Sequence, residues 1–312
     1  MRSEKITASI IIPTFNGGDD LKFTLRAISN QKVDFLYEII IIDSESNDGV
    51  LQTIDEKRTK IISIKKAEFQ HGKTRNDAAS YAVGEFLIFI TQDATPSCKS
   101  WLYDFVHAMK IFSEAAFGFG RHFARPTASP FIKKEISDHF EKINRYPLLI
   151  NSKSNIASNF NSNIEYEQFL HFFSDNNSII KRSVFSKFPF PEVEFGEDQL
   201  WANSAIKRGL TKLYCPNSSV LHSHNYDFTE GLKRSWTEAV FFKNEFGYDL
   251  GKGIDYNSIE KMSIDQANDR AKLILATDEE IRSEIARKKA QLTGFWFAHN
   301  GINPKLITGM PL

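Results

Sequence analysis

Four apolar runs that alternate with helical segments constrain the fold of this chain more than any other feature of its sequence. The runs are "ASIIIPTFN" (8–16), "YEIIIIDSESNDG" (37–49), "IISIKKA" (61–67) and "FLIFITQDA" (86–94). They are apolar throughout rather than alternating, which is typical of strands in a parallel sheet covered by helices on both faces. We therefore expect an α/β fold with a mostly parallel, Rossmann-like sheet.

Polar residues stand where three of these runs end. Thr14 and Phe15 follow Pro13, Asp43 ends the second run, and Gln92 and Asp93 end the fourth. Ligands of parallel sheets bind beyond the carboxyl ends of the strands. A single Asp such as Asp93 is, however, also common as a turn cap. No GxGxxG follows the first run, which argues against a dinucleotide fold of the usual kind.

Two pairs of charged residues open predicted helices. Lys73 and Arg75 lie at the start of "GKTRNDAASYAVGE" (72–85), where a helix N-terminus and basic side chains attract phosphate. Glu197 and Asp198 open a second helix that Gly209 closes. Neighbouring helical residues point about 100° apart, so we expect one carboxylate to face a pocket while the other caps or positions. Both pairs are also typical of solvated helix starts.

The stretch "HSHN" places His222 and His224 on one face of a predicted strand. Two imidazoles on one strand face are moderately indicative of a metal site. The stretch 212–225 itself is expected to form two short strand pieces. The region from about 115 to 170 is rich in Asn, Ser and Phe and is expected to be less regular, with a flexible substrate loop.

Composition limits the class of partner. The chain has 312 residues, with 39 basic and 39 acidic side chains, which argues against a general nucleic-acid binder. Its cysteines, Cys98 and Cys215, form neither a disulfide framework nor a zinc spacing. No apolar run approaches the roughly 18 residues needed to span a bilayer, and the start lacks a signal-peptide pattern. These features predict a cytoplasmic protein.

The C-terminal part reads as helical. Residues 228–242 have the spacing of a long amphipathic helix, and Thr277 with Glu280 form a capping box for a final helix that Gly294 is expected to end. Apolar residues after it, among them Leu306 and Ile307, have three potential fates: packing, subunit contact or membrane contact. Membrane contact would be peripheral, and it is favoured by four basic residues of this helix: Arg282, Arg287, Lys288 and Lys289.

Several motifs in order resemble those of glycosyltransferase family 2, and most closely its bacterial rhamnosyltransferase-like branch. That branch characteristically shows "TQDA", "FFSNVNSAIRRSV", "EDQEWA" and "HSHNY". The corresponding stretches here are "TQDA" (91–94), "FFSDNNSIIKRSV" (172–184), "EDQLWA" (197–202) and "HSHNY" (222–226). The resemblance covers roughly residues 7–247.

The resemblance implies a GT-A fold and an inverting sugar transfer. Residues 1–250 would form the catalytic domain, with the nucleotide-sugar half at about 1–115 and the acceptor half at about 116–250. Residues 251–312 would form a helical extension. The donor would be dTDP-β-L-rhamnose or a UDP-sugar, and the acceptor a surface polysaccharide or a lipid-linked oligosaccharide. The family's processive QxxRW motif is absent, which implies one sugar or a few per acceptor.

The resemblance also implies roles for individual residues. Thr14 and Phe15 would contact the nucleoside, and Asp43 would accept a hydrogen bond from the pyrimidine N–H. The remaining donor-binding residues would be Lys73, Arg75 and Gln92.

For the chemistry, Asp198 would be the catalytic base and Glu197 would support it or contact the acceptor. The family's DxD metal motif is reduced to Thr91-Gln92-Asp93, so Asp93 would hold Mn²⁺ or Mg²⁺ together with His222 or His224.

Three alternatives stay open at this point. One is the same fold with a different donor, such as a UDP-hexose. Another is a catalytically silent glycan- or nucleotide-binding module. A nucleotidyltransferase is the third, although it would require a glycine-rich basic loop where "TFNGGDD" (14–20) is acidic. The oligomeric state is not readable from the sequence.

Overall fold

The computed structural model of this chain describes residues 5–54, 57–154 and 156–304. Its contacts divide the chain into two compact units. The first comprises Met1–Phe123 and His139–His222, and the second comprises Ala124–Asp138 and Ser223–Leu312. The sequence predicts a catalytic domain that ends at residue 250. This boundary is defined by function rather than by compactness, and it stays a prediction.

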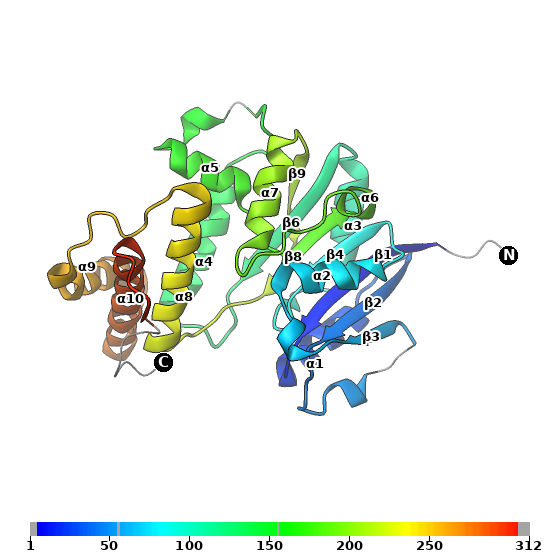
Figure 1. The fold of residues 1–312 in the computed structure, drawn as a ribbon, viewed down its shortest axis with the longest axis horizontal. Helices are drawn as coiled ribbons and strands as arrows, with labels where there is room; N and C mark the ends of the chain where they lie inside the picture. Colours follow the sequence, from blue (N-terminus) through cyan, green and yellow to red (C-terminus); the bar gives the residue numbers. More distant parts are fainter. Residues whose placement is uncertain (1–4, 55–56, 155, 305–312) are drawn as a thin grey trace. The chain divides into compact units, whose positions relative to one another are not determined.

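A nine-stranded mixed sheet forms the centre of the first unit (Figure 1). Eight strands follow the order β3-β2-β1-β4-β8-β6-β9-β5, and β7 pairs with β9. The strands are β1 (Ile6–Thr14), β2 (Leu36–Asp43), β3 (Thr59–Ser63), β4 (Phe86–Ile90), β5 (Thr95–Pro96), β6 (Ala115–Phe123), β7 (Leu149–Ile150), β8 (Asn177–Lys181) and β9 (Thr211–Leu221). The predicted α/β fold with its parallel strands is therefore confirmed.

The four apolar runs form one parallel part of this sheet, and β6 pairs in parallel with β9 in another. β1 pairs in parallel with both β2 and β4, and β2 pairs in parallel with β3. β8 then joins β4 in the antiparallel direction. β1, β2 and β4 are buried along most of their length, with side chains such as Ile10, Ile41 and Ile88 fully inaccessible to solvent. Burial on both faces explains why these strands are apolar throughout.

Helices of the first unit connect the strands. They are α1 (Gly18–Ser29), α2 (His71–Ser80), α3 (Trp101–Ile111), α5 (Asn163–His171), α6 (Arg182–Phe185) and α7 (Glu197–Lys207). The helix α4 (Pro130–Ile143) contributes residues to both units.

The expectation of an irregular region at 115–170 is wrong for most of its described residues, although those of 144–162 contain only the short strand β7 and a 3₁₀ turn at Ala157–Asn159. The region contains β6, α4 and α5, and aromatic side chains form much of its buried surface. Phe117 and Phe119 of β6 are buried against aromatic rings of the same unit, including Phe173 and Tyr214. Phe alternates with Gly over Phe117–Gly120 only, because the strand then continues through Arg121, His122 and the exposed Phe123.

The stretch 212–225 also differs from its expectation. Its residues 212–221 lie in one long strand, β9, rather than in two pieces, although the register with β6 shifts between Gly120 and His122. β6 advances by two residues there while β9 advances by five, from Cys215 to Val220, so the shift accommodates three extra residues without ending the strand. β9 ends at Leu221, so the expectation that His222 and His224 share one face of a strand is wrong.

The second unit is helical. It contains α8 (Phe228–Phe241), α9 (Ile259–Ala271) and α10 (Asp278–His299), with a short π-helical turn at Phe242–Phe246. α8 and α10 pack side by side around Leu232, Ala290 and Phe297 (Figure 1). The capping box at Thr277 is confirmed, since its hydroxyl accepts a hydrogen bond from the Glu280 N–H.

Gly294 does not end α10, contrary to expectation, because the helix continues to His299. A Cβ at Gly294 would lie 2.7 Å from the Leu232 carbonyl oxygen of α8. The glycine therefore permits two helices to approach closely, which is a packing role rather than a stop signal.

Three of the basic residues of α10, namely Arg287, Lys288 and Lys289, lie near acidic side chains within the second unit. Arg287 contacts Glu284 and Glu135, and Lys289 contacts Glu260. Lys288 is buried, 3.9 Å from Glu135. The Arg287 guanidinium, despite burial of the site, holds the pKa of Glu135 at about 2.

Two observations bear on the expected fates of the C-terminal tail. Leu306 and Ile307 lie outside the described residues, whereas Trp296 and Ile302 pack on the α8–α10 core. Among the helices of the described chain, none combines the length and hydropathy that a membrane span requires.

Candidate active site

The carboxyl ends of β1, β2 and β4 meet at one edge of the sheet. Thr14 lies opposite Asp43 in the β1–β2 register. The Thr14 hydroxyl donates to Gln92 Oε1 over 2.6 Å, and the Phe15 N–H donates to the same oxygen over 3.0 Å. The Gln92 amide in turn donates to the Phe15 carbonyl over 3.3 Å. Gln92 therefore fixes the segment after β4 to the end of β1, which brings three predicted site residues together.

Asp43 is buried at the end of β2 and shapes the turn that follows. Its carboxylate accepts the Ser46 N–H over 3.1 Å. Glu45 adopts a left-handed conformation with φ of 64°, and its carboxylate accepts the Lys66 N–H over 2.9 Å. The Lys66 ammonium lies 4.3 Å from the centre of the Phe15 ring. An aromatic ring and a cation thus stand together at the strand ends, beside a buried carboxylate.

Asp93 and His222 form a second part of the site. β5 pairs with β9 so that Thr95 lies opposite Leu221, and this register brings Asp93 next to His222. Asp93 Oδ2 lies 3.5 Å from His222 Nε2. A carboxylate oxygen beside an imidazole nitrogen is a donor set that suits Mn²⁺, and less closely Mg²⁺. His224 lies two residues further along the chain, where the second unit begins.

Arg75 is buried near the start of α2, where carboxylates from two other segments meet it. Its Nε lies 2.7 Å from Asp175 Oδ2, and its Nη1 donates to Glu197 Oε1 over 3.2 Å. Lys73, in contrast, is half-exposed and pairs with Asp77 within the helix at 2.5 Å. Lys73 and Arg75 therefore have different environments, although they are close in sequence. Their contact with the donor stays a prediction.

Two glycines position the start of α7 against α2. Gly196 precedes Glu197 with φ of 73°, a left-handed conformation that glycine adopts without strain. Gly72 lies so close to the preceding loop that a Cβ there would meet the Pro191 carbonyl oxygen at 2.1 Å. These close approaches bring Glu197 within reach of Arg75.

Glu197 and Asp198 are adjacent but have different surroundings. Glu197 is buried, and burial together with the nearby Asp175 carboxylate raises its pKa to about 9. Asp198 is half-buried and accepts the N–H groups of Gln199 over 2.7 Å and of Asp175 over 3.4 Å. Burial, and again Asp175, raise the Asp198 pKa to about 7. Both pKa values are thus shifted toward the protonated form, and the shift of Glu197 is the larger of the two.

Asp175 is a site residue that sequence reasoning missed. It lies in the coil between α5 and β8, where no periodicity singles out a side chain. One difference from the family motif could have indicated it: this chain has "FFSD" at 172–175, where the rhamnosyltransferase-like branch has "FFSN".

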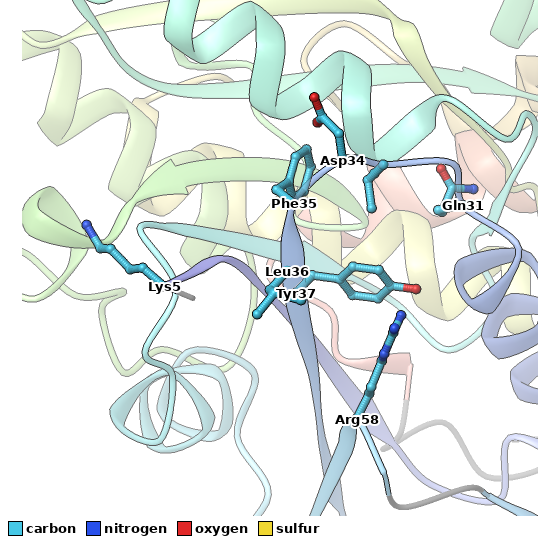
Figure 2. A pocket seen from close by; sticks show the side chains of 8 residues that line it. Lys5, Gln31, Asp34, Phe35, Leu36, Tyr37 and Arg58 are labelled. Carbon is cyan, nitrogen blue, oxygen red and sulfur yellow. The ribbon is translucent and has the colours of Figure 1, made fainter. Parts of the chain in front are cut away.

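A separate cavity of about 520 Å³ lies at the opposite, amino ends of β1 and β2 (Figure 2). Lys5 and Arg58 flank it, and Phe35, Leu36 and Tyr37 are among the residues that line it. Since ligands of parallel sheets bind at the carboxyl ends of the strands, this cavity is distinct from the candidate active site.

Known proteins are similar to this chain in sequence over most of its length. The sequence model of glycosyl transferase family 2 matches residues 9–188. The O-antigen chain rhamnosyltransferase WbaN of Salmonella anatum is 30 % identical over 262 residues, which cover 80 % of this chain and 78 % of WbaN.

Solved structures share the fold at low sequence identity. Residues 1–349 of S. aureus TarS, in complex with UDP-GlcNAc, align with a TM-score of 0.54 at 15 % identity, over 95 % of this chain and 91 % of that one. The mannosyltransferase PcManGT of Pyrobaculum calidifontis, with GDP-Man and Mn²⁺, aligns with a TM-score of 0.55 at 16 % identity, over 91 % and 74 % of the chains. The family match covers more than half of the sequence, and the chain therefore belongs to glycosyltransferase family 2 and is a GT-A glycosyltransferase.

Proposed function

We propose that this enzyme transfers L-rhamnose from dTDP-β-L-rhamnose to a hydroxyl group of a surface polysaccharide or a lipid-linked oligosaccharide, with inversion at the anomeric carbon. The observation that carries the reaction is the environment of Asp198. Its carboxylate is half-buried at the start of α7, with a pKa raised to about 7 by burial and by Asp175. A general base works best when its pKa lies near the operating pH.

The choice of sugar rests on the relatives. WbaN is named as an O-antigen chain rhamnosyltransferase, and RfbN of Salmonella typhimurium carries the same description at 31 % identity over 81 % of this chain. A UDP-sugar is the alternative donor, since TarS, which shares the fold, was solved with UDP-GlcNAc.

In the proposed reaction, Asp198 accepts the proton of the acceptor hydroxyl while that oxygen attacks the anomeric carbon of rhamnose. The bond between this carbon and the phosphate oxygen breaks, and its electron pair leaves with dTDP. One displacement inverts the configuration, so a β-linked donor gives an α-L-rhamnoside. Glu197 stays protonated next to Asp198 and so does not compete for the hydroxyl proton.

On the donor side, Thr14, Phe15 and Gln92 form the joined ends of β1 and β4, and Asp43 lies at the end of β2. We propose that the nucleoside binds along this edge, with Asp43 accepting the pyrimidine N–H. Lys73, half-exposed on α2, is the candidate contact for the diphosphate.

For the metal, Asp93 and His222 are the proposed ligands in the first unit, with His224 as the candidate third ligand. A bound Mn²⁺ or Mg²⁺ would offset negative charge on the departing diphosphate. A mannosyltransferase with the same fold, PcManGT, was solved with Mn²⁺ and its nucleotide sugar, which supports a metal here.

A donor screen followed by product analysis tests this function. Thermal shift with dTDP, UDP and GDP, each with Mn²⁺ and with EDTA, selects the nucleotide. Transfer from dTDP-β-L-rhamnose to a lipid-linked oligosaccharide is then followed by linkage analysis. Formation of an α-L-rhamnoside supports the proposal. Turnover of a UDP-hexose with dTDP-β-L-rhamnose left intact, or binding of glycan without any transfer, would overturn it.

A further inference from the structure

The buried cluster at the start of α7 has more acidic groups than cations. Asp175, Glu197 and Asp198 surround Arg75, whose guanidinium contacts the first two. We propose that Asp175 is a positioning residue for the base: its carboxylate occupies Arg75 and so leaves Glu197 protonated, while its backbone N–H holds the Asp198 carboxylate. This inference rests on the proposed role of Asp198. It adds a positioning residue, Asp175, and states which carboxyl group of the cluster carries a proton.

The coil that carries Asp175 is anchored on the side of α5. Lys212 of β9 is almost fully buried, and its ammonium donates to the carbonyl oxygens of Phe169, Leu170 and Phe172 over 2.7–2.9 Å. These carbonyls belong to the end of α5 and the residue after it, where helical carbonyls lack partners within the helix. Lys212 therefore fixes the backbone that leads to Asp175.

The same coil is anchored on the side of β8. Asn177 is fully buried, and its side-chain oxygen accepts the Trp101 indole N–H over 2.8 Å. Its amide group donates to the Ser218 carbonyl over 2.7 Å. With Lys212 on one side and Asn177 on the other, Asp175 is held on a short segment between two buried polar anchors. Such support is what a residue needs if its carboxylate and its N–H are to act at fixed distances.

The charge balance follows from these contacts. Asp175 lies 2.7 Å from Arg75 Nε, whereas Glu197 accepts from Nη1 over 3.2 Å. One guanidinium balances one carboxylate, and an unbalanced buried carboxylate takes up a proton instead. The closer carboxylate, Asp175, lies at the guanidinium, and Glu197, whose pKa burial and Asp175 raise, is the member that takes up the proton.

Two further titratable groups lie on the elements packed against α7. His171 of α5 is buried, and burial lowers its pKa to about 4, so the imidazole is neutral. Burial lowers the pKa of Lys212 to about 7, and its amino group is directed at carbonyl oxygens rather than at the carboxylates, so it titrates alike in the wild type and in variants of Asp175. The charge next to Asp198 is therefore set by Asp175, Arg75 and the neutral Glu197.

The pH dependence of stability separates this role from that of an ordinary ion pair. In the wild type, the folded protein keeps a proton on Glu197 that the unfolded chain releases above its usual pKa of about 4.3. This raised pKa gives a stability contribution that is present at low pH and is lost as pH rises toward about 9. In Asp175→Asn, Glu197 becomes the partner of Arg75 and ionises, so this loss is smaller.

The first experiment compares thermal unfolding of the wild type and Asp175→Asn between about pH 5 and pH 9. We expect the midpoint of Asp175→Asn, relative to the wild type, to increase as pH rises. Asp104→Asn removes a carboxylate from α3 that accepts the Ser100 hydroxyl, and it is the matched control. Its midpoint is expected to differ from that of the wild type by the same amount at every pH. A constant offset for Asp175→Asn as well would make Asp175 a simple ion-pair partner and overturn the proposal.

The second experiment uses the pH profile of dTDP release from dTDP-β-L-rhamnose, with or without acceptor. In Asp175→Asn the negative charge passes to Glu197, which is adjacent to Asp198, so the ascending limb is expected to stay near its wild-type position while the maximum rate falls, and Asp175→Glu is expected to restore part of that rate. The double variant Asp175→Asn/Glu197→Gln has neither charge, and removing a negative neighbour lowers the pKa of a carboxylate by about one unit or more, so its limb is expected to shift to lower pH. A limb of Asp175→Asn that shifts as far as that of the double variant would overturn the inference. Absence of turnover in the wild type would instead refute the proposed donor, and the unfolding experiment would still decide the role of Asp175.

Discussion

The guanidinium of Arg75 and the carboxyl group of Glu197 form a buried contact at 3.2 Å, although they lie on α2 and α7. This contact distinguishes two adjacent acids. Glu197 is directed to the cation, while Asp198 accepts backbone N–H groups from Asp175 and Gln199. The sequence motif "ED" therefore contains one supporting carboxyl group and one that is suited to take a proton.

Replacing Asp198 by Asn is expected to abolish most of the transfer while preserving the fold. The amide has the same shape but cannot accept the acceptor's proton, and general-base catalysis is typically worth about 10²–10⁴ in rate. Steady-state transfer rates measure the loss, and calorimetry with dTDP serves as the control for donor binding. Transfer at a near wild-type rate would exclude Asp198 as the base. Glu197 would then be the next candidate for that role.

The rate of transfer by the wild type should rise with pH through about 7. The base acts only when deprotonated, and burial with the Asp175 charge raises the Asp198 pKa to about 7. The profile of kcat/KM between about pH 5 and pH 9 reports this titration in the free enzyme. A flat profile over that interval would contradict the assignment.

Asp93→Ala or His222→Ala should remove the metal-dependent part of dTDP binding. Residues that only support metal ligands typically contribute about 10–100-fold to metal affinity, so loss of a ligand is expected to cost at least about 100-fold. Calorimetry with Mn²⁺ and with EDTA measures the effect. His107→Ala, which removes an exposed imidazole stacked on Tyr103, is the matched control. Equal dTDP affinity of the wild type in both conditions would argue against a bridging metal.

Gly294→Ala should destabilise the second unit, whereas Gly231→Ala should not. A Cβ at Gly294 would lie 2.7 Å from the Leu232 carbonyl oxygen, while a Cβ at Gly231 would make an ordinary contact of 3.6 Å with Ala290. Overpacking costs about 1–3 kcal/mol, and alanine in a helix interior gains about 0.5–1 kcal/mol over glycine. Denaturant unfolding of both variants measures the difference. Equal effects of the two substitutions would show that the α8–α10 crossing tolerates a wider spacing.

The full chain is expected to stay unbound in flotation with anionic liposomes at physiological salt. Arg287 and Lys289 already contact acidic side chains of the second unit, and Lys288 is buried. Cations that are paired in this way contribute little attraction to anionic lipid. Truncation after residue 276 is the comparison. Flotation of the full chain but not of the truncated one would instead support peripheral membrane contact.

The strand-end residues were predictable because continuous apolar runs define where buried strands stop. Asp43 and Asp93 follow such runs directly, so a sequence pattern is enough to place them at one edge of a sheet. The environment of Arg75 was not predictable, since its partners come from a coil and a distant helix that only tertiary packing brings together. Gly294 was misread for a related reason: a glycine in a helix interior and a glycine after a helix look alike until the neighbouring helix is known.

The position of β8 has a consequence for how the chain acquires its structure during synthesis. β8 is made after β6 but lies between β4 and β6, pairing with both. Until residues 177–181 leave the ribosome, the free edges of two apolar strands stay exposed, and exposed edges promote aggregation. A fragment that stops near residue 115 should therefore be a poor candidate for separate expression, although it contains the four strands β1 to β4.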